Sequence, residues 1–314
     1  MDKQSRIFVA GHRGLVGRAI CRSLEQSGFR NLVLRTRSEL DLRDQAAVTD
    51  FFNTATPEYV FLAAARVGGI FANSKYPADF IYDNLAIQTS VLKAACECGV
   101  RKLLFLGSSC IYPRLAPQPI KEEYLLSGPL EPTNEWYAIA KIAGIKLAQA
   151  LRLQHGFNAI SVMPTNLYGP GDNFDPETSH VVPALIRKFQ QAIANGDPEV
   201  TVWGTGSARR EFLHVDDLAE AAIFLMSNYE SEAIVNVGTG VDITIRELAD
   251  LIKKVSSFEG RIVFDSSKPD GTPRKVLDVS KIAALGWRHR RSFEDGIRET
   301  YCWYVGTKRR EDLG

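Results

Sequence analysis

A glycine-rich turn near the N-terminus constrains the fold more than any other feature of this sequence. The apolar run Ile7–Ala10 has the length of a buried strand, and it leads through GHRGLVG into a helix predicted from Arg18 to Gln26. The spacing G-x-x-G-x-x-G between strand and helix is typical of a turn that accepts a pyrophosphate at free main-chain N–H groups. The predicted nucleotide contacts are Gly11, His12, Arg13, Gly14, Leu15, Val16 and Gly17.

The end of the second predicted strand, Asn31–Leu34, indicates which nucleotide is bound. An NAD site usually carries Asp or Glu there to hold the ribose 2′-hydroxyl, whereas this chain continues with Arg35-Thr36-Arg37. Guanidinium groups suit a 2′-phosphate, and Arg13 in the glycine turn adds a third. The alternative is that these arginines are solvated surface residues. We expect NADPH or NADP as the cofactor, with Arg37 as one of its contacts.

Strands and helices alternate along the first half of the chain. Further apolar runs at Tyr59–Leu62, Lys102–Leu106 and Ala159–Met163 are separated by helical segments such as Pro77–Cys98. This alternation predicts an α/β fold with a Rossmann-type, doubly wound parallel sheet. From about residue 171 the composition shifts toward aromatic and basic loops. We therefore expect an NADP-binding Rossmann domain over 1–170 and mainly a smaller C-terminal α/β substrate-binding domain over 171–314, with some segments returning to the sheet.

Three segments are expected to depart from regular structure. Gly68-Gly69 predicts a flexible loop, and Pro164–Gly171 predicts a loop that leaves the sheet. The last helix is expected from Phe293 to Tyr304, and the residues from Thr307 onward are expected to fray.

Composition narrows the class of protein. Lys plus Arg number 38 and Asp plus Glu 37, so the net charge of +1 favours neither a nucleic acid nor an anionic membrane surface. The chain has no long apolar stretch that would span a membrane. Five cysteines without a disulfide spacing indicate a reducing cytoplasm, and Cys96 and Cys98 face different sides of a predicted helix, so no metal site is expected.

The segment from Lys102 to Lys141 carries the chemistry. Its strand ends in Ser108-Ser109-Cys110, and a helix opening at Asn134 places Tyr137 and Lys141 four residues apart on one face. A tyrosine is a poor acid or base near neutral pH, and a neighbouring ammonium favours its phenolate. Together with the nucleotide turn, this arrangement predicts a proton-transfer site.

These motifs resemble those of the extended short-chain dehydrogenase/reductases and, more closely, the GDP-L-fucose synthase family. The matching stretches are GHRGLVG, FLGSSCIYP, EPTNEWYAIAKIAG, SVMPTNLYGP, SHVVPAL, REFLHVDD, VNVGTG and KPDGTPRK. The resemblance implies a bifunctional, NADPH-dependent 3,5-epimerase and 4-reductase that converts GDP-4-keto-6-deoxy-D-mannose to GDP-L-fucose. It also implies a cytoplasmic homodimer built through a four-helix bundle, with possible association with the upstream GDP-mannose 4,6-dehydratase.

The resemblance implies a role for each matched catalytic residue. Ser108 binds the carbonyl oxygen, with Ser109 as its rival, while Tyr137 and Lys141 serve reduction. Epimerisation requires two groups on opposite faces of the sugar, and Cys110 and His180 match the family's base and acid. The implied cofactor contacts beyond the glycine turn are Arg37, Leu106, Gly107, Ser108, Ser109, Tyr137, Lys141, Pro164, Thr165, Asn166, Leu167 and His180.

The GDP end of the substrate needs cations and a surface for guanine. The implied substrate residues are Lys188, Trp203, Arg210 and Asp270. Arg187, Arg209 and Arg274 are close rivals, and the alternative for all of them is a solvated basic face.

Two other classes of protein compete: another nucleotide-sugar enzyme of this fold, and a non-catalytic protein. A nucleotide-sugar 4,6-dehydratase of this fold would follow the catalytic hydroxyl with an Asp/Glu pair, where this chain has Ser109-Cys110, and a 4-epimerase usually retains NAD. A non-catalytic NADP-binding sensor is the alternative from another class. The intact set of Ser108, Tyr137 and Lys141 argues against a sensor.

Overall fold

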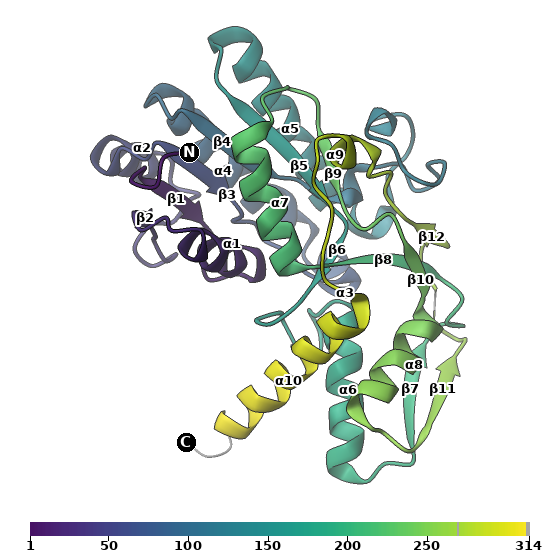
Figure 1. Ribbon diagram of the computed structural model, residues 1–314. Helices are drawn as coiled ribbons and strands as arrows, with labels where there is room; N and C mark the ends of the chain where they lie inside the picture. The colour runs from purple at the N-terminus through teal and green to yellow at the C-terminus, as the bar shows by residue number, and fades with distance from the viewer. Residues whose placement is uncertain (269, 312–314) are drawn as a thin grey trace.

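The computed structural model describes residues 1–268 and 270–311 of the 314-residue chain. A six-stranded sheet forms its centre (Figure 1), and all neighbouring strands in it are parallel. The strand order is β2-β1-β3-β4-β5-β9, formed by β2 (Leu32–Val33), β1 (Ile7–Ala10), β3 (Tyr59–Leu62), β4 (Lys102–Leu106), β5 (Ala159–Pro164) and β9 (Val235–Val237). The predicted doubly wound parallel sheet is therefore confirmed.

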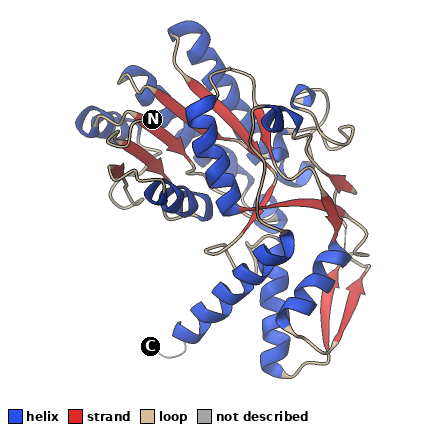
Figure 2. Ribbon diagram, viewed as in Figure 1, coloured by secondary structure: helices blue, strands red, loops and turns tan. Residues whose placement is uncertain are grey.

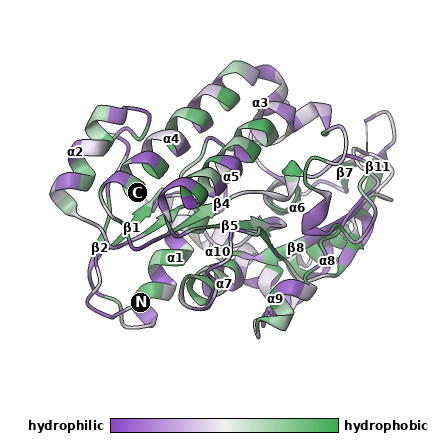
Figure 3. Cartoon of the chain, turned by 90° about the horizontal axis from the view of Figure 1, so that it is seen from above, coloured by the Kyte–Doolittle hydropathy of each residue, from purple (hydrophilic) through white to green (hydrophobic). Residues whose placement is uncertain are grey.

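Helices cover both faces of this sheet (Figures 2 and 3). One face packs against α1 (Leu15–Gln26) and α7 (Val215–Asn228), and the other against α2 (Gln45–Ala55), α4 (Pro77–Glu97) and α5 (Glu135–His155). The strands are apolar on both sides because both sides are buried. Within β1, for example, Ile7 and Val9 belong to one core cluster, while Phe8 belongs to the other.

The C-terminal elements form a second group beside the sheet (Figure 1). Strand β8 (Arg209–His214) pairs with β6 (Asn166–Tyr168), β10 (Asp242–Thr244) and β12 (Arg274–Lys275), while β7 (Glu199–Trp203) pairs with β11 (Arg261–Asp265). Helices α6 (Val181–Asn195), α8 (Ile245–Ser256) and α10 (Phe293–Glu311) pack with these strands around a third core cluster. The division into two domains near residue 170 stays a prediction.

Several expected boundaries differ from the structure. The segment after Gly68-Gly69 is not a loop but a short helix, α3 (Ile70–Lys75), and Asn73 stabilises it by donating to the carbonyl oxygens of Gly68 and Gly69. Part of the loop expected at Pro164–Gly171 is strand β6. The last helix continues to Glu311, so the prediction that the chain frays from Thr307 was wrong for residues 307–311. Residues 312–314 lie outside the described part of the chain. Helix α9 (Ser280–Ala284) and strands β7, β8, β10 and β12 were not predicted.

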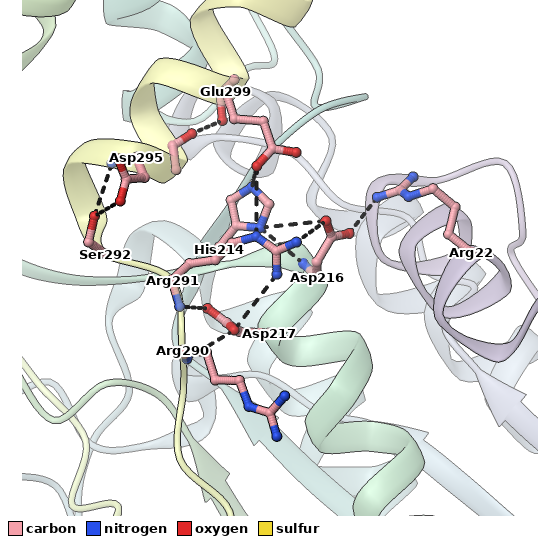
Figure 4. A network of polar contacts seen from close by, with 11 residues as sticks. Arg22, His214, Asp216, Asp217, Arg290, Arg291, Ser292, Asp295 and Glu299 are labelled. Carbon is pink, nitrogen blue, oxygen red and sulfur yellow. Dashed lines mark hydrogen bonds and ion pairs between the residues drawn. The ribbon is translucent and has the colours of Figure 1, made fainter. Parts of the chain in front are cut away.

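A polar network attaches α10 to the start of α7 and to α1 (Figure 4). His214 caps α7 by accepting from the Asp216 main-chain N–H, and its Nε2 lies 3.7 Å from a Glu299 carboxylate oxygen. Arg291 pairs with Asp216 and Glu299, and Arg22 of α1 also pairs with Asp216. Ligand-type atoms of His214, Asp216 and Glu299 lie within 4.8 Å of one another, but these two guanidinium groups already neutralise the carboxylates. The network is therefore an ion-pair junction between elements.

Among the described residues, the helices are too short or too polar to cross a lipid bilayer.

Candidate active site

The site is located by the topology of the sheet. Strand β1 lies between β2 and β3 in the sheet. The chain passes from β1 to β2 on one side and then crosses to β3 on the other, so the connections run in opposite directions from β1 and β3. Ligands of doubly wound proteins bind outside the carboxyl ends of the strands at such a switch point. The glycine turn follows β1, Ser108 follows β4, and the segment Thr165–Leu167 follows β5, so the predicted cofactor segments share this edge.

The glycine turn is shaped by close main-chain contacts. Gly11 has a φ of +86°, and a Cβ on it would lie 2.7 Å from the main-chain nitrogen of Ala64 after β3. A Cβ on Gly17 would lie 2.1 Å from the Gly11 carbonyl oxygen, so both positions require glycine. At Gly14, the nearest atom to such a Cβ is the Gly11 oxygen at 3.4 Å, which leaves open space at the N-terminus of α1.

The start of α1 fits a pyrophosphate. Gly14 is its N-cap and has no side chain to satisfy the free main-chain N–H groups, and the first turn contains no acidic residue. The helix is 12 residues long, so its dipole adds to these unpaired donors. The cofactor residues Leu15 and Val16 stand in this first turn. A dinucleotide phosphate therefore meets positive potential and no competing carboxylate here.

The arginines predicted to bind the 2′-phosphate lie on the surface beside this turn. Arg13, Arg35 and Arg37 are all exposed. Burial lowers the pKa of His12, and the nearby Arg13 charge lowers it further, while a hydrogen bond with the Arg35 main chain acts in the opposite direction. Arg13 and Arg35 therefore meet around His12. Arg37 lies within electrostatic range of Asp41.

Ser108 sits where β4 ends. Its hydroxyl accepts from the Cys110 main-chain N–H at 3.2 Å and so caps the short 3₁₀ turn Ser109–Ile111. Ser108 also hydrogen-bonds the Tyr137 phenol. Its rival Ser109 is buried, with 3% of its surface exposed. The geometry therefore favours Ser108 over Ser109 as the hydroxyl beside the tyrosine.

Tyr137 and Lys141 stand one turn apart on α5, against the end of β4. Burial raises the pKa of Tyr137, nearby charge at Cys110 raises it further, and the Ser108 hydrogen bond lowers it. The Lys141 ammonium lies 5.8 Å from the Tyr137 ring centroid and donates to the Leu106 carbonyl oxygen at 2.7 Å. Burial lowers the pKa of Lys141 to about 7. The pKa values of both side chains therefore differ strongly from those in water, as is common for residues in active sites.

Cys110 lies in the same pocket as a second group of polar side chains. Its sulfur accepts from the Asn134 side-chain amide at 3.3 Å and from the Lys275 ammonium at 3.6 Å. Its charge influences Tyr137, so the thiol and the phenol are neighbours. The pocket is lined by Cys110, Tyr112, Pro113, Arg114, Gln118, Ile120, Glu131, Asn134, Thr272, Arg274 and Lys275.

His180 is the N-cap of α6. Its side chain reaches the solvent-accessible surface, yet enough protein surrounds it for desolvation to lower its pKa below 6.5. The preceding residues contact the turn before α3, where the Gly69 main-chain N–H donates to Thr178 at 3.0 Å. Helix α3 in turn packs near Pro132–Asn134, which leads to Cys110. His180 thus belongs to the same region, connected to Cys110 through these segments.

The cofactor segment after β5 is held from the C-terminal side. Thr165 and Asn166 both donate from their side chains to the Glu211 carbonyl oxygen, at 3.2 and 2.8 Å, and Leu167 pairs with Leu213 in β8. The Pro164–Leu167 segment is therefore fixed between the sheet and β8. This gives it a defined position at the edge where a cofactor would lie.

The four predicted substrate residues form one contiguous group. The Lys188 ammonium lies 5.3 Å from the Trp203 ring centroid, and the indole is 65% exposed. Asp270 accepts from the Thr205 main-chain N–H at 2.8 Å, next to Trp203-Gly204, and its carbonyl oxygen contacts the Arg210 guanidinium at 3.4 Å. An exposed aromatic face flanked by cations suits a nucleotide base with a phosphate attached.

The structure separates the rival arginines from Arg210. Arg209 and Arg274 both pair with the Asp242 carboxylate, and Arg209 also lies 4.0 Å from the Glu247 carboxylate, so both guanidinium groups are held in ion pairs. Arg210 instead contacts main-chain oxygens, and burial lowers its pKa. Arg187 keeps a buried Nε without a hydrogen-bond partner among the described residues, so it remains a rival.

Sequence reasoning missed three residues of this region. Asn134 and Lys275 contact the Cys110 sulfur, and Thr205 fixes Asp270. Asn134 and Lys275 were part of quoted motifs, EPTNEWY and KPDGTPRK, so the motifs marked their importance without indicating their contacts. Pro269 of the second motif lies outside the described residues.

Comparison with known proteins agrees with this geometry. The family model for the NAD dependent epimerase/dehydratase family matches residues 7–238. Probable GDP-L-fucose synthase 1 of Oryza sativa subsp. japonica is 65% identical over 97% of this chain and 93% of its own length. GDP-L-fucose synthase of Escherichia coli (strain K12) is 58% identical over 97% and 98% of the two chains. A crystal structure of a GDP-L-fucose synthetase from Naegleria fowleri bound to NADP is 32% identical, with a TM-score of 0.92, over 98% of this chain and 95% of that one.

Proposed function

Since this chain belongs to the NAD dependent epimerase/dehydratase family and, within it, to the GDP-L-fucose synthases, we propose that the residues around Tyr137 and Cys110 carry out the two reactions of that activity. The chain is an NADPH-dependent epimerase and reductase that forms GDP-L-fucose. The substrate proposed is GDP-4-keto-6-deoxy-D-mannose. The observation that carries the proposal is the grouping of Ser108 with both Cys110, from whose main-chain N–H it accepts a hydrogen bond, and Tyr137.

Ketone reduction needs a proton at the oxygen that was the C4 carbonyl. NADPH supplies the hydride when it is bound. Ser108 holds the carbonyl oxygen, and Tyr137, whose raised pKa keeps it protonated, donates its proton to that oxygen. Lys141 stands close enough for its charge to stabilise the resulting phenolate.

Epimerisation needs a base and an acid on opposite faces of the sugar ring. The C3 and C5 protons are acidic because both carbons adjoin the 4-ketone, so a base can form an enolate. We assign this base to Cys110 and the returning acid to His180, which approach from β4 and from α6. The same assignment leaves Tyr137 committed to the carbonyl oxygen.

The GDP portion is assigned to the C-terminal group of residues. Lys188 and Arg210 supply cations for the diphosphate, and Trp203 supplies an apolar face for guanine. Asp270 accepts hydrogen bonds and holds the Trp203–Thr205 turn. The cofactor is assigned to the glycine turn, Arg37, the Leu106–Ser109 segment, the Pro164–Leu167 segment and His180.

Product analysis tests these assignments. The enzyme is incubated with GDP-4-keto-6-deoxy-D-mannose and NADPH in heavy water, and the product is identified by NMR. The proposal expects GDP-L-fucose with deuterium at C3 and C5. A 6-deoxy sugar without inversion at those carbons would exclude the epimerase assignment, and absence of NADPH consumption would favour a non-catalytic NADP-binding sensor.

A homodimer is proposed through α4 and α5, which pack against each other on one face of the sheet. Their outer surface carries large exposed side chains: Tyr82 is 69% exposed, Trp136 43% and Leu153 86%. Covering such side chains stabilises a dimer. Light scattering with gel filtration should show a dimer, and Tyr82→Glu should shift it toward the monomer, whereas the exposed-site control Leu115→Glu should not.

Two further expectations concern the surroundings of the enzyme. All five cysteines are free, as is usual in a reducing compartment, which supports a cytoplasmic location. Association with the upstream GDP-mannose 4,6-dehydratase is proposed because that enzyme supplies the keto sugar. Calorimetric titration of one purified enzyme into the other tests it, and a lack of binding heat together with independent sedimentation would exclude it.

A further inference from the structure

The Cys110 sulfur lies between two nitrogen donors from distant parts of the chain. The Asn134 amide, at the start of α5, is 3.3 Å away, and the Lys275 ammonium of β12 is 3.6 Å away, 165 residues further along the sequence. A neutral thiol is a weak hydrogen-bond acceptor, whereas a thiolate is a strong one that an ammonium stabilises. Two donors directed at one sulfur are therefore the surroundings that a thiolate requires.

Among the described residues, the Lys275 ammonium is not paired with a carboxylate. Among the residues that the structure describes, the Cys110 sulfur is its one hydrogen-bond partner, and Lys275 has no ion pair with any described carboxylate. The other charged groups of the pocket are matched: Arg274 pairs with Asp242, and Arg114 pairs with Glu131. The Lys275 ammonium is thus the unpaired positive charge beside the sulfur.

The main chain holds Lys275 in place from both sides. Within β12, Lys275 pairs in register with Arg210 of β8. The next residue, Val276, donates to the Gln118 side chain at 2.9 Å and accepts from Ile120 at 2.8 Å. The lysine therefore extends to the sulfur from a backbone that is fixed between β8 and the 118–120 segment.

We propose that Lys275 is the positioning residue that keeps Cys110 in the thiolate form, and that Asn134 orients the sulfur. The inference rests on the proposed function, in which Cys110 is the epimerisation base. In that step the thiolate takes a proton from C3 or C5, an S–H bond forms as the C–H bond breaks, and the electron pair passes to the enolate. The thiol then returns its proton to solvent, and the ammonium restores the thiolate.

The other titratable groups facing the sulfur are Tyr137 from α5, together with Arg114, Glu131 and Arg274 in the pocket wall. Burial raises the pKa of Tyr137, and its neighbour Cys110 raises it further, which favours the protonated phenol. Lys275 thus allows a charged base and a neutral acid to stand side by side.

Alkylation of Cys110 by iodoacetamide tests the inference without depending on activity. Peptide mass spectrometry follows the rate at Cys110 between pH 5.5 and 9.5 in the wild type, Lys275→Met and Lys275→Arg. We expect Lys275→Met to shift the profile upward by about one pH unit, making alkylation near pH 7 about tenfold slower. Lys275→Arg should restore the profile, because it keeps the charge.

Controls separate this inference from loss of folding and from the proposed function. Lys121→Met removes an exposed ammonium and should leave the profile unchanged. Lys275→Met should also lose deuterium uptake at C3 and C5 while still oxidising NADPH with the keto sugar. Identical alkylation profiles for wild type and Lys275→Met would overturn the inference. A shifted profile combined with full epimerisation by Cys110→Ser would instead overturn the assignment of the base.

Discussion

The ammonium of Lys141 donates to the carbonyl oxygen of Leu106 at 2.7 Å and so joins α5 to the last residue of β4. Lys141 is 3% exposed, and its ammonium also lies 4.8 Å from the Phe105 ring centroid and 5.8 Å from that of Tyr137. Burial outweighs these contacts and lowers the pKa of Lys141 to about 7. The cofactor-free protein therefore holds a lysine that destabilises the fold whenever it is charged.

Lys141→Met should therefore stabilise the cofactor-free protein while abolishing reduction. The folded-state pKa of about 7 lies below that of an unfolded lysine, so the charged form is penalised fully below pH 7. The penalty decreases as the pH rises from 7 toward about 10.4. Urea unfolding should show that Lys141→Met increases the free energy of unfolding more at pH 6 than at pH 9. A gain that increases with pH would contradict the assignment.

Lys102→Met should be less favourable for stability than Lys141→Met, because burial lowers the pKa of Lys102 less, to about 8. The Lys102 ammonium is also buried, but it donates to the carbonyl oxygens of Leu225, Met226 and Tyr229 at 2.6 to 3.2 Å, at the C-terminal end of α7. Its loss removes a donor from all three oxygens, of which Leu225 still accepts from the Tyr229 main-chain N–H, and an unsatisfied buried acceptor costs about 1–3 kcal/mol. Urea unfolding at pH 7 measures the change. A Lys102→Met variant as stable as the wild type would show that water replaces the ammonium.

Tyr137→Phe should fold and bind NADPH yet lose ketone reduction by about 100-fold or more, the typical contribution of a positioned general acid. Stopped-flow oxidation of NADPH at saturating keto sugar measures the rate. Ser108→Ala should lose less if Ser109 can substitute. Tyr229→Phe removes a hydroxyl that bonds Ala233 away from the site and serves as the control. A Tyr137→Phe variant with nearly normal NADPH oxidation would remove the phenol from the mechanism.

Replacing Arg35 and Arg37 together with Ala should reduce the preference for NADPH over NADH. A paired phosphate contact accounts for a preference of about tenfold or more. The ratio of kcat/KM with the two cofactors measures it. Arg30→Ala, which removes an exposed guanidinium bonded to Glu25, is the matched control. Equal ratios in the double variant and the wild type would move the assignment to Arg13.

Cys110→Ser and His180→Asn should each lose epimerisation and keep reduction. Serine preserves size but is a far weaker base, and asparagine cannot return a proton. Each variant should reduce the 4-ketone directly to a non-fucose 6-deoxy sugar, without deuterium at C3 and C5. Cys96→Ser and His155→Asn are the controls for the same chemical changes elsewhere. If Cys110→Ser forms GDP-L-fucose with normal deuterium uptake, the cysteine is a packing residue.

The strands of the parallel sheet could be predicted because both of their faces are buried. Tyr59–Leu62 and Lys102–Leu106 are unbroken apolar runs between polar turns, and the structure gives β3 and β4 the same bounds. Strand β7 was missed because Thr201 and Trp203 face solvent, so its run is short and half polar. Strand β12 has two residues, which is too few for any pattern.

The candidate site was predictable where its residues are close in sequence. Tyr137 and Lys141 share a helix face, and Ser108 follows a strand end, so local spacing indicated their grouping. The contact of Lys275 with Cys110 depends instead on how β12 pairs with β8. No local pattern encodes that pairing. The Asp242 carboxylate, which pairs with Arg209 and Arg274 but not with Arg210, is likewise 33 and 32 residues from its two partners.

The buried carboxylate of Glu211 has a consequence for attempts to recombine this protein with its relatives. It accepts from the main-chain N–H groups of Thr239, Gly240 and Leu277, so one side chain holds two loops together from β8. A chimera whose crossover separates β8 from either loop must rebuild this main-chain geometry around a carboxyl group with no exposed surface. The loop at Thr239-Gly240 and the segment at Leu277 should therefore be exchanged together with β8, and transplanting either of them alone should destabilise the fold.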